Sequence, residues 1–375
     1  MRFLHLHSSF AAGGKELRAA RLMNLFGPVI GHTVVSAQRG AYGAAVALDP
    51  ALQVDYPQDF PGLTGAPTPW RLLRLARAMR GFDLILTYNW GAMDAVLAHR
   101  LYGAGLGLAP LVHHEDGFNE DEAVRLKPSR NLFRRLALAR ASALVVPSRR
   151  LEAIALGPWH QPRSRVRLIV NGIDTAAYRN KPAPDALPGL IKAPGEKWVG
   201  TLAGLRAVKN LPRLVRAFAA LPADWRLVIV GEGPERAAIE AQAAACGIAG
   251  RVHLPGFAAH PARVAGLFDI FALSSDSEQF PISVVEAMAA GIAVASPAVG
   301  DVAGMVSVEN RPFVTPAGDE AALAQSLALL AADGALRSAL GTANRACAQA
   351  NYDENAMVRA YREIYARAMG IARFP

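Results

Sequence analysis

Two carboxylates lie eight positions apart in this chain, Glu278 in a polar segment and Glu286 in an apolar one. The apolar run 270–273 predicts a short buried strand, residues 274–281 predict a loop, and Val284–Ala290 predict a helix. The unpaired N–H groups at the start of a helix favour an anion, most often a phosphate. Glu278 would face whatever the phosphate carries, and Glu286 could accept hydrogen bonds from vicinal hydroxyls. This layout suits a sugar nucleotide.

Each carboxylate also has an ordinary structural explanation. Ser283 followed three residues later by Glu286 is a capping-box pattern, in which Glu286 only reaches back to the backbone N–H of Ser283. Glu278 could be a solvated loop charge, which is the commoner fate of a lone acidic residue. The local sequence leaves both explanations open.

Two further positions could do chemistry in the first half of the chain. Gly13 and Gly14 follow the first expected strand, where the backbone can approach a phosphate or sugar closely; an ordinary turn is the alternative. His113 ends another expected strand and begins a His-His-Glu-Asp run. Because the later strand ends offer no His or Cys at ligand spacing, we expect no metal there.

The segment from Ser275 to Gly291 resembles the Glu, seven residues, Glu motif of the family 4 glycosyltransferases, which are retaining enzymes of the GT-B fold. The variant is the one in which a Glu-Gln-Phe-Pro loop precedes a Glu-Ala-Met-Ala-Ala-Gly helix. Other landmarks of the family follow in order, at residues 13–16, 113–117, 146–148, 171–174, 209–210, 231–234 and 255–257. Each landmark is a weak signal, but the ordered set covers nearly the whole chain.

The resemblance implies a site for a nucleoside-diphosphate sugar. Glu278 would orient the donor sugar, Glu286 would hold the ribose, and Lys209 would place a point charge on the diphosphate. His113 would approach the reacting end of the sugar, with His114 as the alternative register and a structural histidine as the ordinary explanation. The other donor-binding positions it implies are Gly13, Gly14, Arg206, Gly231, Gly233, Phe257, Phe280, Ile282 and Ser283.

Two positions depart from the family's pattern. An arginine is usual five residues before Lys209, where this chain has Gly204; Arg206 lies two residues further on and could reach the phosphates instead. Pro281 stands where many relatives carry glycine, and it removes one N–H that could bind the donor. Among the implied donor-binding positions, Phe257 could instead be an aromatic residue of the hydrophobic core.

Alternating apolar and helical segments predict an α/β protein with two doubly wound, Rossmann-like domains, which in the GT-B fold face each other across a cleft. We expect an N-terminal acceptor domain over residues 1–180, a linker over 181–196, a donor domain over 197–353, and a helix over 354–375 that crosses back to the first domain. The expected strands are 3–6, 33–37, 84–87, 111–113, 143–146 and 167–170, then 198–202, 225–230, 252–254, 270–273 and 293–295.

Basic residues are concentrated in the first half of the chain. Residues 1–190 carry 23 Lys and Arg against 14 Asp and Glu, whereas residues 191–375 carry 17 of each. Arginines recur through Leu-rich sequence in 71–80 and 130–140, as in basic amphipathic helices that contact anionic membrane; solvated helix faces are the alternative. No aromatic stacking set or recognition motif accompanies the charge, so we expect no nucleic-acid partner.

Composition favours a cytoplasmic protein. The 375 residues are 52% hydrophobic, enough for two cores, and Cys246 and Cys347 form no disulfide framework. The apolar run at the N-terminus is too short for a signal peptide, and no stretch approaches the roughly 18 apolar residues of a membrane span. We expect a cytoplasmic enzyme, with peripheral contact at the inner membrane face as an addition.

The combined prediction is a retaining hexosyltransferase that needs no metal or other cofactor. Its donor would be a nucleoside-diphosphate sugar, with UDP as the default and GDP-mannose as the second choice, and its acceptor a glycan or a lipid-linked glycan. A GT-B sugar-nucleotide epimerase is one alternative. A non-catalytic sugar-nucleotide-binding protein is the other, and Gly204 is its main support.

Overall fold

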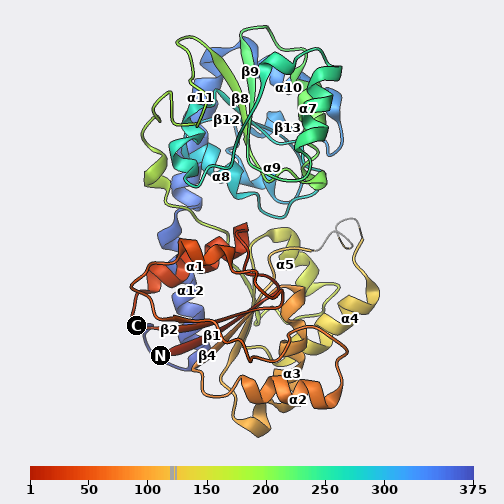
Figure 1. Cartoon of the computed structure of the whole chain (residues 1–375), viewed down its shortest axis with the longest axis vertical. Helices are drawn as coiled ribbons and strands as arrows, with labels where there is room; N and C mark the ends of the chain where they lie inside the picture. The colour runs from red at the N-terminus through yellow and green to blue at the C-terminus, as the bar shows by residue number, and fades with distance from the viewer. Residues whose placement is uncertain (119–121, 123–124) are drawn as a thin grey trace. The chain divides into compact units, whose positions relative to one another are not determined.

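The computed structural model describes residues 1–118, 122 and 125–375, which form two compact units (Figure 1). Residues 1–171 and 357–375 make up the first unit, and residues 172–356 make up the second. The segment 181–196, which the sequence suggests as a linker, lies within the second unit.

A parallel sheet of seven strands forms the centre of the first unit, in the order β3-β2-β1-β4-β5-β6-β7. The strands are β1 (Arg2–His7), β2 (Gly31–Ser36), β3 (Val54–Asp55), β4 (Leu84–Tyr88), β5 (Leu111–His114), β6 (Ala143–Val146) and β7 (Val166–Leu168). The sequence predicted all of them except β3, whose two residues are too few to give an apolar run. The seventh strand begins and ends earlier than the predicted 167–170.

Helices cover both faces of this sheet. They are α1 (Gly14–Phe26), α2 (Pro69–Ala78), α3 (Met93–Leu106), α4 (Pro128–Ala137), α5 (Arg149–Leu156) and most of α12 (Glu354–Met369). Side chains alternate between the faces along each strand, because successive residues of a strand point to opposite sides. Leu4 and Ile85 therefore pack in a core with α2 and α3, whereas Phe3 and Leu84 pack with α1 and α12.

The second unit contains a six-stranded parallel sheet in the order β10-β9-β8-β11-β12-β13. The strands are β8 (Lys197–Leu202), β9 (Trp225–Val230), β10 (Val252–Gly256), β11 (Ile270–Ala272), β12 (Ala293–Pro297) and β13 (Val314–Thr315). The helices are α6 (Leu211–Phe218), α7 (Arg236–Ala245), α8 (Ile282–Ala289), α9 (Val302–Met305), α10 (Glu320–Ala332) and α11 (Gly334–Asn351). Because β8 and β11 are neighbours in a parallel sheet, the loops that follow them emerge at the same edge.

The terminal helix α12 returns the chain to the first unit. Its first three residues belong to the second unit, and Met357 begins the part that belongs to the first. Tyr361 and Tyr365 of this helix are buried, and the Tyr365 ring contacts Phe3 with the ring centroids 6.2 Å apart. Over residues 1–118, 122 and 125–375, no helix has the length and hydropathy that crossing a bilayer requires.

Candidate active site

The loops that follow β8 and β11 are bonded to each other in the second unit. The backbone N–H of Asp276 donates to the carbonyl of Val208 over 2.9 Å, and the Ser274 hydroxyl donates to the carbonyl of Lys209 over 3.0 Å. The Asp276 carboxylate also lies 2.7 Å from Nη1 of Arg213, in the first turn of α6. These contacts join the two loops into one surface that positions their functional side chains.

Lys209 and Glu278 form an ion pair on this surface. Nζ of Lys209 lies 2.5 Å from Oε1 of Glu278, although the residues are 69 positions apart in the chain. The Ser275 hydroxyl donates to the same oxygen over 2.8 Å. Both side chains keep some exposed surface, so an anion could reach the ammonium and a hydroxyl could reach the carboxylate. The structure therefore brings together a cation and a carboxylate that the sequence assigns to one donor molecule.

Glu286 lies in the second turn of α8, and its side chain is half-buried. The hydroxyl of Tyr178, in the short 3-10 helix Thr175–Tyr178, donates to Oε1 of Glu286 over 3.1 Å. Burial raises the pKa of Glu286 to about 7, because a carboxylate removed from water favours its neutral form, and the Tyr178 bond offsets only part of this effect. Burial and the Glu286 carboxylate raise the pKa of Tyr178 as well.

The capping-box explanation of Glu286 is wrong in this structure. The helix α8 begins at Ile282, one residue before the expected cap, and its N-cap is Pro281, which makes no side-chain capping bond. Ser283 is therefore a residue of the first turn, and the partner observed for Glu286 is Tyr178. The carboxylate thus makes no contribution as a local cap.

Gly300 supports the Glu278 loop from the segment after β12. Its φ is +56°, and a Cβ at this position would lie 2.6 Å from the carbonyl oxygen of Glu278 and 2.5 Å from that of Gln279. The backbone N–H of Asp301 donates to the Gln279 carbonyl over 3.1 Å. A glycine is thus required for the close packing that fixes this loop.

Gly231 and Gly233 lie in the loop that follows β9, with φ of +152° and +155°. A Cβ at Gly231 would lie 1.9 Å from the carbonyl oxygen of Ala203, and one at Gly233 would lie 2.4 Å from that of Leu205. The glycines therefore allow this loop to pack directly on the segment after β8. Their predicted contact with a donor stays a prediction.

Arg206 lies over the position where the family's usual arginine is missing. A Cβ at Gly204 would lie 3.7 Å from Nε of Arg206, and its other near neighbour would be the Glu232 carbonyl oxygen at 3.9 Å. Both Gly204 and Arg206 are exposed. The guanidinium of Arg206 thus stands beside Gly204 at the edge of the sheet that carries Lys209.

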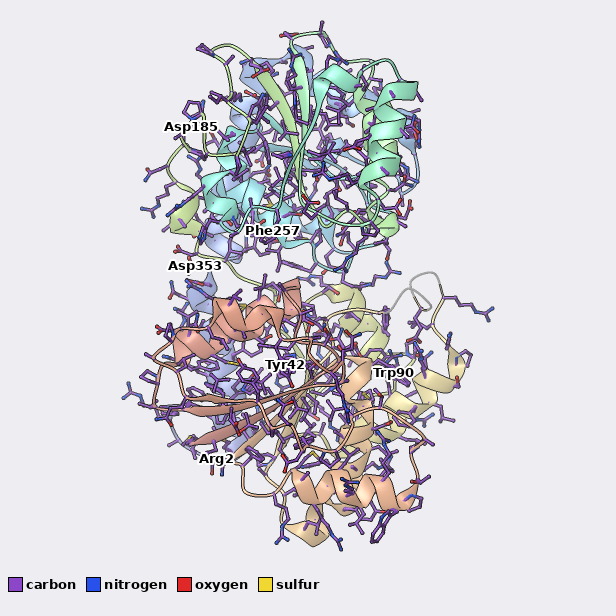
Figure 2. All side chains as sticks on the ribbon, viewed as in Figure 1. Arg2, Tyr42, Trp90, Asp185, Phe257 and Asp353 are labelled. Atoms are coloured by element: carbon purple, nitrogen blue, oxygen red, sulfur yellow. The ribbon has the colours of Figure 1, made fainter. Side chains whose placement is uncertain are left out.

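Aromatic residues of the predicted site differ in exposure. Phe257, in the loop after β10, is 68% exposed, so its alternative as a core residue is wrong (Figure 2). Phe280 is buried, and its ring contacts Tyr352 with the ring centroids 5.7 Å apart. The Phe280 ring is therefore a packing residue of the second unit, and its predicted contact with a donor stays a prediction. Ile282 and Ser283 are half-buried at the start of α8.

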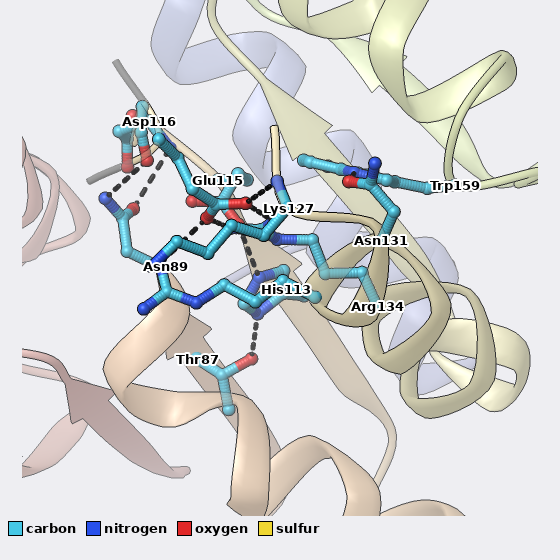
Figure 3. A network of polar contacts seen from close by, with 12 residues as sticks. Thr87, Asn89, His113, Glu115, Asp116, Lys127, Asn131, Arg134 and Trp159 are labelled. Carbon is cyan, nitrogen blue, oxygen red and sulfur yellow. Dashed lines mark hydrogen bonds and ion pairs between the residues drawn. The ribbon is translucent and has the colours of Figure 1, made fainter. Parts of the chain in front are cut away.

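The predicted residues of the first unit lie at the carboxyl edge of its sheet. His113 is fully buried at the end of β5, where its Nδ1 is 2.8 Å from the Thr87 hydroxyl and its Nε2 is 3.8 Å from Oε2 of Glu115 (Figure 3). Glu115 is also 3.5 Å from Nε of Arg134, another buried side chain. His113 therefore faces a charged group of its own unit in this structure.

His114 points to the opposite face of the sheet. Its Nε2 is 2.9 Å from the hydroxyl of Tyr365 in α12, and burial lowers the pKa of His114 to about 3. It is thus a neutral histidine of the core. Gly13 is the N-cap of α1 and Gly14 its first residue, without a side-chain cap.

His, Cys, Asp and Glu form no group of three or more that could hold a metal ion among the residues described. The metal-independent reaction stays a prediction.

Two family models match consecutive parts of the chain. Residues 30–177 match the model described as Glycosyltransferase Family 4, and residues 188–346 match the model described as Glycosyl transferases group 1. The second match contains the positions from Arg206 to Glu286 that form the site in the second unit. The chain belongs to glycosyltransferase family 4.

Curated relatives of this family 4 glycosyltransferase are distant. N-acetyl-alpha-D-glucosaminyl L-malate synthase of Bacillus anthracis is 23% identical over 279 residues, which are 73% of this chain and 71% of the relative. 2-deoxystreptamine glucosyltransferase of Streptomyces kanamyceticus is 26% identical over 202 residues, 52% of each chain. The second match therefore spans about half of each protein.

Solved structures show that the fold is GT-B. Anabaena Alr3699/HepE in complex with UDP superposes with a TM-score of 0.80 at 20% identity, covering 98% of this chain and 100% of that chain. Sucrose-phosphate synthase from Thermosynechococcus elongatus gives a TM-score of 0.77 at 21% identity, covering 99% and 100%. The predicted α/β architecture is confirmed, since each unit of this family 4 enzyme has its own parallel sheet.

Sequence reasoning missed several residues of the site. Tyr178, Ser275, Asp276 and Gly300 had no role in the prediction, although each contacts a predicted residue or its loop. For Ser275 and Asp276 a signal existed, since both belong to the loop of Glu278. For Tyr178 none did, because it lies 108 positions before Glu286.

Proposed function

We propose that this family 4 glycosyltransferase moves a hexose from a UDP-sugar to a glycan or lipid-linked acceptor with retention of configuration. One observation carries the proposal: Lys209 and Glu278 are paired at 2.5 Å, on two bonded loops at one sheet edge, with α8 following directly. A cation, a helix start and two carboxylates are the groups that a sugar nucleotide needs. UDP is favoured because HepE was solved with UDP and with UDP-glucose.

Each group has one assigned part of the donor. Lys209 and the first N–H groups of α8 would bind the diphosphate and stabilise the charge that it gains as the glycosidic bond breaks. Arg206 would add a second positive charge from beside Gly204. Glu278 would accept hydrogen bonds from the sugar hydroxyls once the diphosphate competes for Lys209, and Glu286 would accept them from the ribose.

The reaction itself would use the departing diphosphate as the base. On the face of the sugar from which the diphosphate leaves, one of its oxygens would take the proton of the acceptor hydroxyl, and the acceptor oxygen would bond to the anomeric carbon. Lys209 and the first N–H groups of α8 would stabilise the negative charge of the leaving diphosphate, and we propose that no metal takes part. His113, which lies between the Thr87 hydroxyl and the Glu115 carboxylate, would support the positive charge that develops on the sugar.

We further propose that the enzyme works in the cytoplasm and contacts the anionic inner face of the membrane through its basic first half. The excess of Lys and Arg over Asp and Glu within residues 1–190 supports this partner, because anionic lipid attracts clustered basic residues. A lipid-linked acceptor would then be reached at the surface where it resides.

A donor screen tests the proposal. The purified protein is heated with UDP, GDP, ADP and TDP and their sugar conjugates, and the stabilising series is then incubated with and without EDTA. Release of sugar or its transfer, with the anomeric configuration kept in the product by NMR, supports a retaining transferase. An isomerised donor would identify an epimerase, binding without turnover would identify a binding protein, and activity lost with EDTA would refute the metal-independent mechanism.

A further inference from the structure

The outward face of α2 carries an exposed indole among arginines. Trp70 is 73% exposed, and Arg74 and Arg77 follow it on the same side of the helix, while Leu72 and Leu75 point into the core. Trp70, Leu73, Arg74 and Arg77 line a shallow hollow of about 240 Å³. An aromatic ring and two guanidinium groups around one hollow suit an anionic group attached to apolar material.

The same face continues over α3 and α4. The hydroxyl of Tyr102, in α3, donates to the carbonyl of Pro69 at the start of α2 over 3.1 Å, and Arg100 donates to the carbonyl of Leu136 near the end of α4. Leu101, between these two anchors, is 55% exposed. Leu132 and Leu136 on α4 are 55% and 47% exposed. Figure 1 shows these helices on the outer side of the first unit, away from α1 and α12.

The charges on this face have one sign. The helices α2 and α4 contain no Asp or Glu, and the one acidic residue of α3, Asp94, lies 2.7 Å from Arg71 and is neutralised by it. Arg74, Arg77 and Arg135 are exposed. An approaching anionic surface would therefore meet only attraction from the exposed groups of α2 and α4.

We propose that this face is a docking surface for an anionic phospholipid bilayer. We call it the α2–α4 face, and it consists of Trp70, Leu73, Arg74, Arg77, Leu101, Leu132, Arg135 and Leu136. The hollow at Trp70 takes a lipid phosphate between Arg74 and Arg77, and the indole lies at the level of the headgroups, where tryptophan is favoured. The leucines enter the boundary of the acyl chains.

The form of the face favours a bilayer over a protein or nucleic acid. Its apolar side chains protrude from three helices with arginines among them, instead of lining one groove that a peptide helix would fill. Nucleic acid would be read by stacking aromatic rings in a charged channel, and this face offers one exposed indole. A fluid anionic bilayer can take up separate apolar side chains among its lipids while its headgroups attract the surrounding arginines.

Vesicle binding of the full chain tests the proposal. Of the five tryptophans, Trp70 is the exposed one, so its fluorescence should shift to the blue with phosphatidylglycerol-containing vesicles and not with phosphatidylcholine vesicles. The Trp70→Phe variant should lose the shift. In a flotation assay, the Arg74→Gln/Arg77→Gln variant should bind these vesicles about 30-fold more weakly. Each basic residue near the surface contributes about 1 kcal/mol of attraction to anionic lipid, and two such contributions correspond to about 30-fold in affinity. Raised salt should weaken the binding of the parent protein.

A matched control variant distinguishes binding through the α2–α4 face from attraction by the net charge of the whole protein. Arg39→Gln/Arg311→Gln removes the same net charge at two exposed arginines elsewhere, and it should bind vesicles as the parent does. Equal losses in both double variants, or equal binding to phosphatidylcholine, would overturn the proposal. The inference rests on the membrane contact proposed above, but vesicle binding needs no donor. The donor screen and the vesicle assay can therefore fail independently.

Discussion

Replacing Glu286 by glutamine should make the donor-free protein more stable and a weaker binder of UDP. Burial raises the pKa of Glu286 from 4.5 to about 7, so the folded protein holds this proton more tightly than the unfolded chain does. The stability that results is fully present below about pH 4.5 and is lost as the pH rises through about 7. At pH 8 the ionised carboxylate is thus a burial cost that a neutral amide avoids.

The size of the gain follows from the pKa shift. At about 1.36 kcal/mol for each pKa unit, a pKa raised from 4.5 to about 7 corresponds to at most about 3.4 kcal/mol. Residual exposure of the side chain reduces this figure, and we expect a gain of roughly 1–3 kcal/mol at pH 8, or several degrees in Tm. UDP affinity should fall roughly 10- to 100-fold, since hydrogen bonds to a charged acceptor contribute about 1.5–3 kcal/mol.

Differential scanning calorimetry and titration calorimetry with UDP between pH 5 and pH 8.5 measure both quantities. The stability difference between Glu286→Gln and the parent should grow with pH, and UDP affinity of the parent should fall as the pH drops through about 7, because the ribose hydroxyls bind the ionised form. Glu309→Gln, the same change at an exposed carboxylate of the second unit, should alter neither. A lower Tm at pH 8 with unchanged UDP affinity would refute the reasoning.

Three further predictions concern the same site. Tyr178→Phe removes the bond that opposes the raised pKa of Glu286, so the pH below which UDP binding weakens should move upward in the same titrations. Lys209→Ala should lower kcat roughly 100-fold in a donor-turnover assay, as expected for the loss of one group that stabilises the leaving charge; a change below about 2-fold would contradict its role. Arg206→Ala should lower kcat, and adding Gly204→Arg should restore it, because the two side chains would share one location. If Gly204→Arg alone raises kcat severalfold, the missing arginine limits the parent and Arg206 does not replace it.

Much of the fold followed from the sequence because strands and helices carry local periodic signals. The buried strands β6 and β9 were predicted with their observed bounds, since Ser142 and Pro147 flank the first apolar run and Asp224 and Gly231 flank the second. The missed strands β3 and β13 have two residues each, and their existence depends on a neighbouring strand. The start of α8 was predicted late, because the Ser283 capping pattern outweighed a helix that begins directly after proline.

The candidate site also has features that the sequence predicted and features that only the tertiary structure revealed. The sequence by itself determined that Glu278 and Glu286 flank a helix start and that Lys209 and the glycine-rich turns follow strands, since loop and helix spacing are properties of neighbouring residues. Only the tertiary structure decided that Lys209 meets Glu278, that Tyr178 meets Glu286, and that Phe257 is exposed while Phe280 is buried. The physical reason is the order of the strands: β8 and β11 are adjacent in the sheet, and this adjacency brings together loops that lie far apart in the chain.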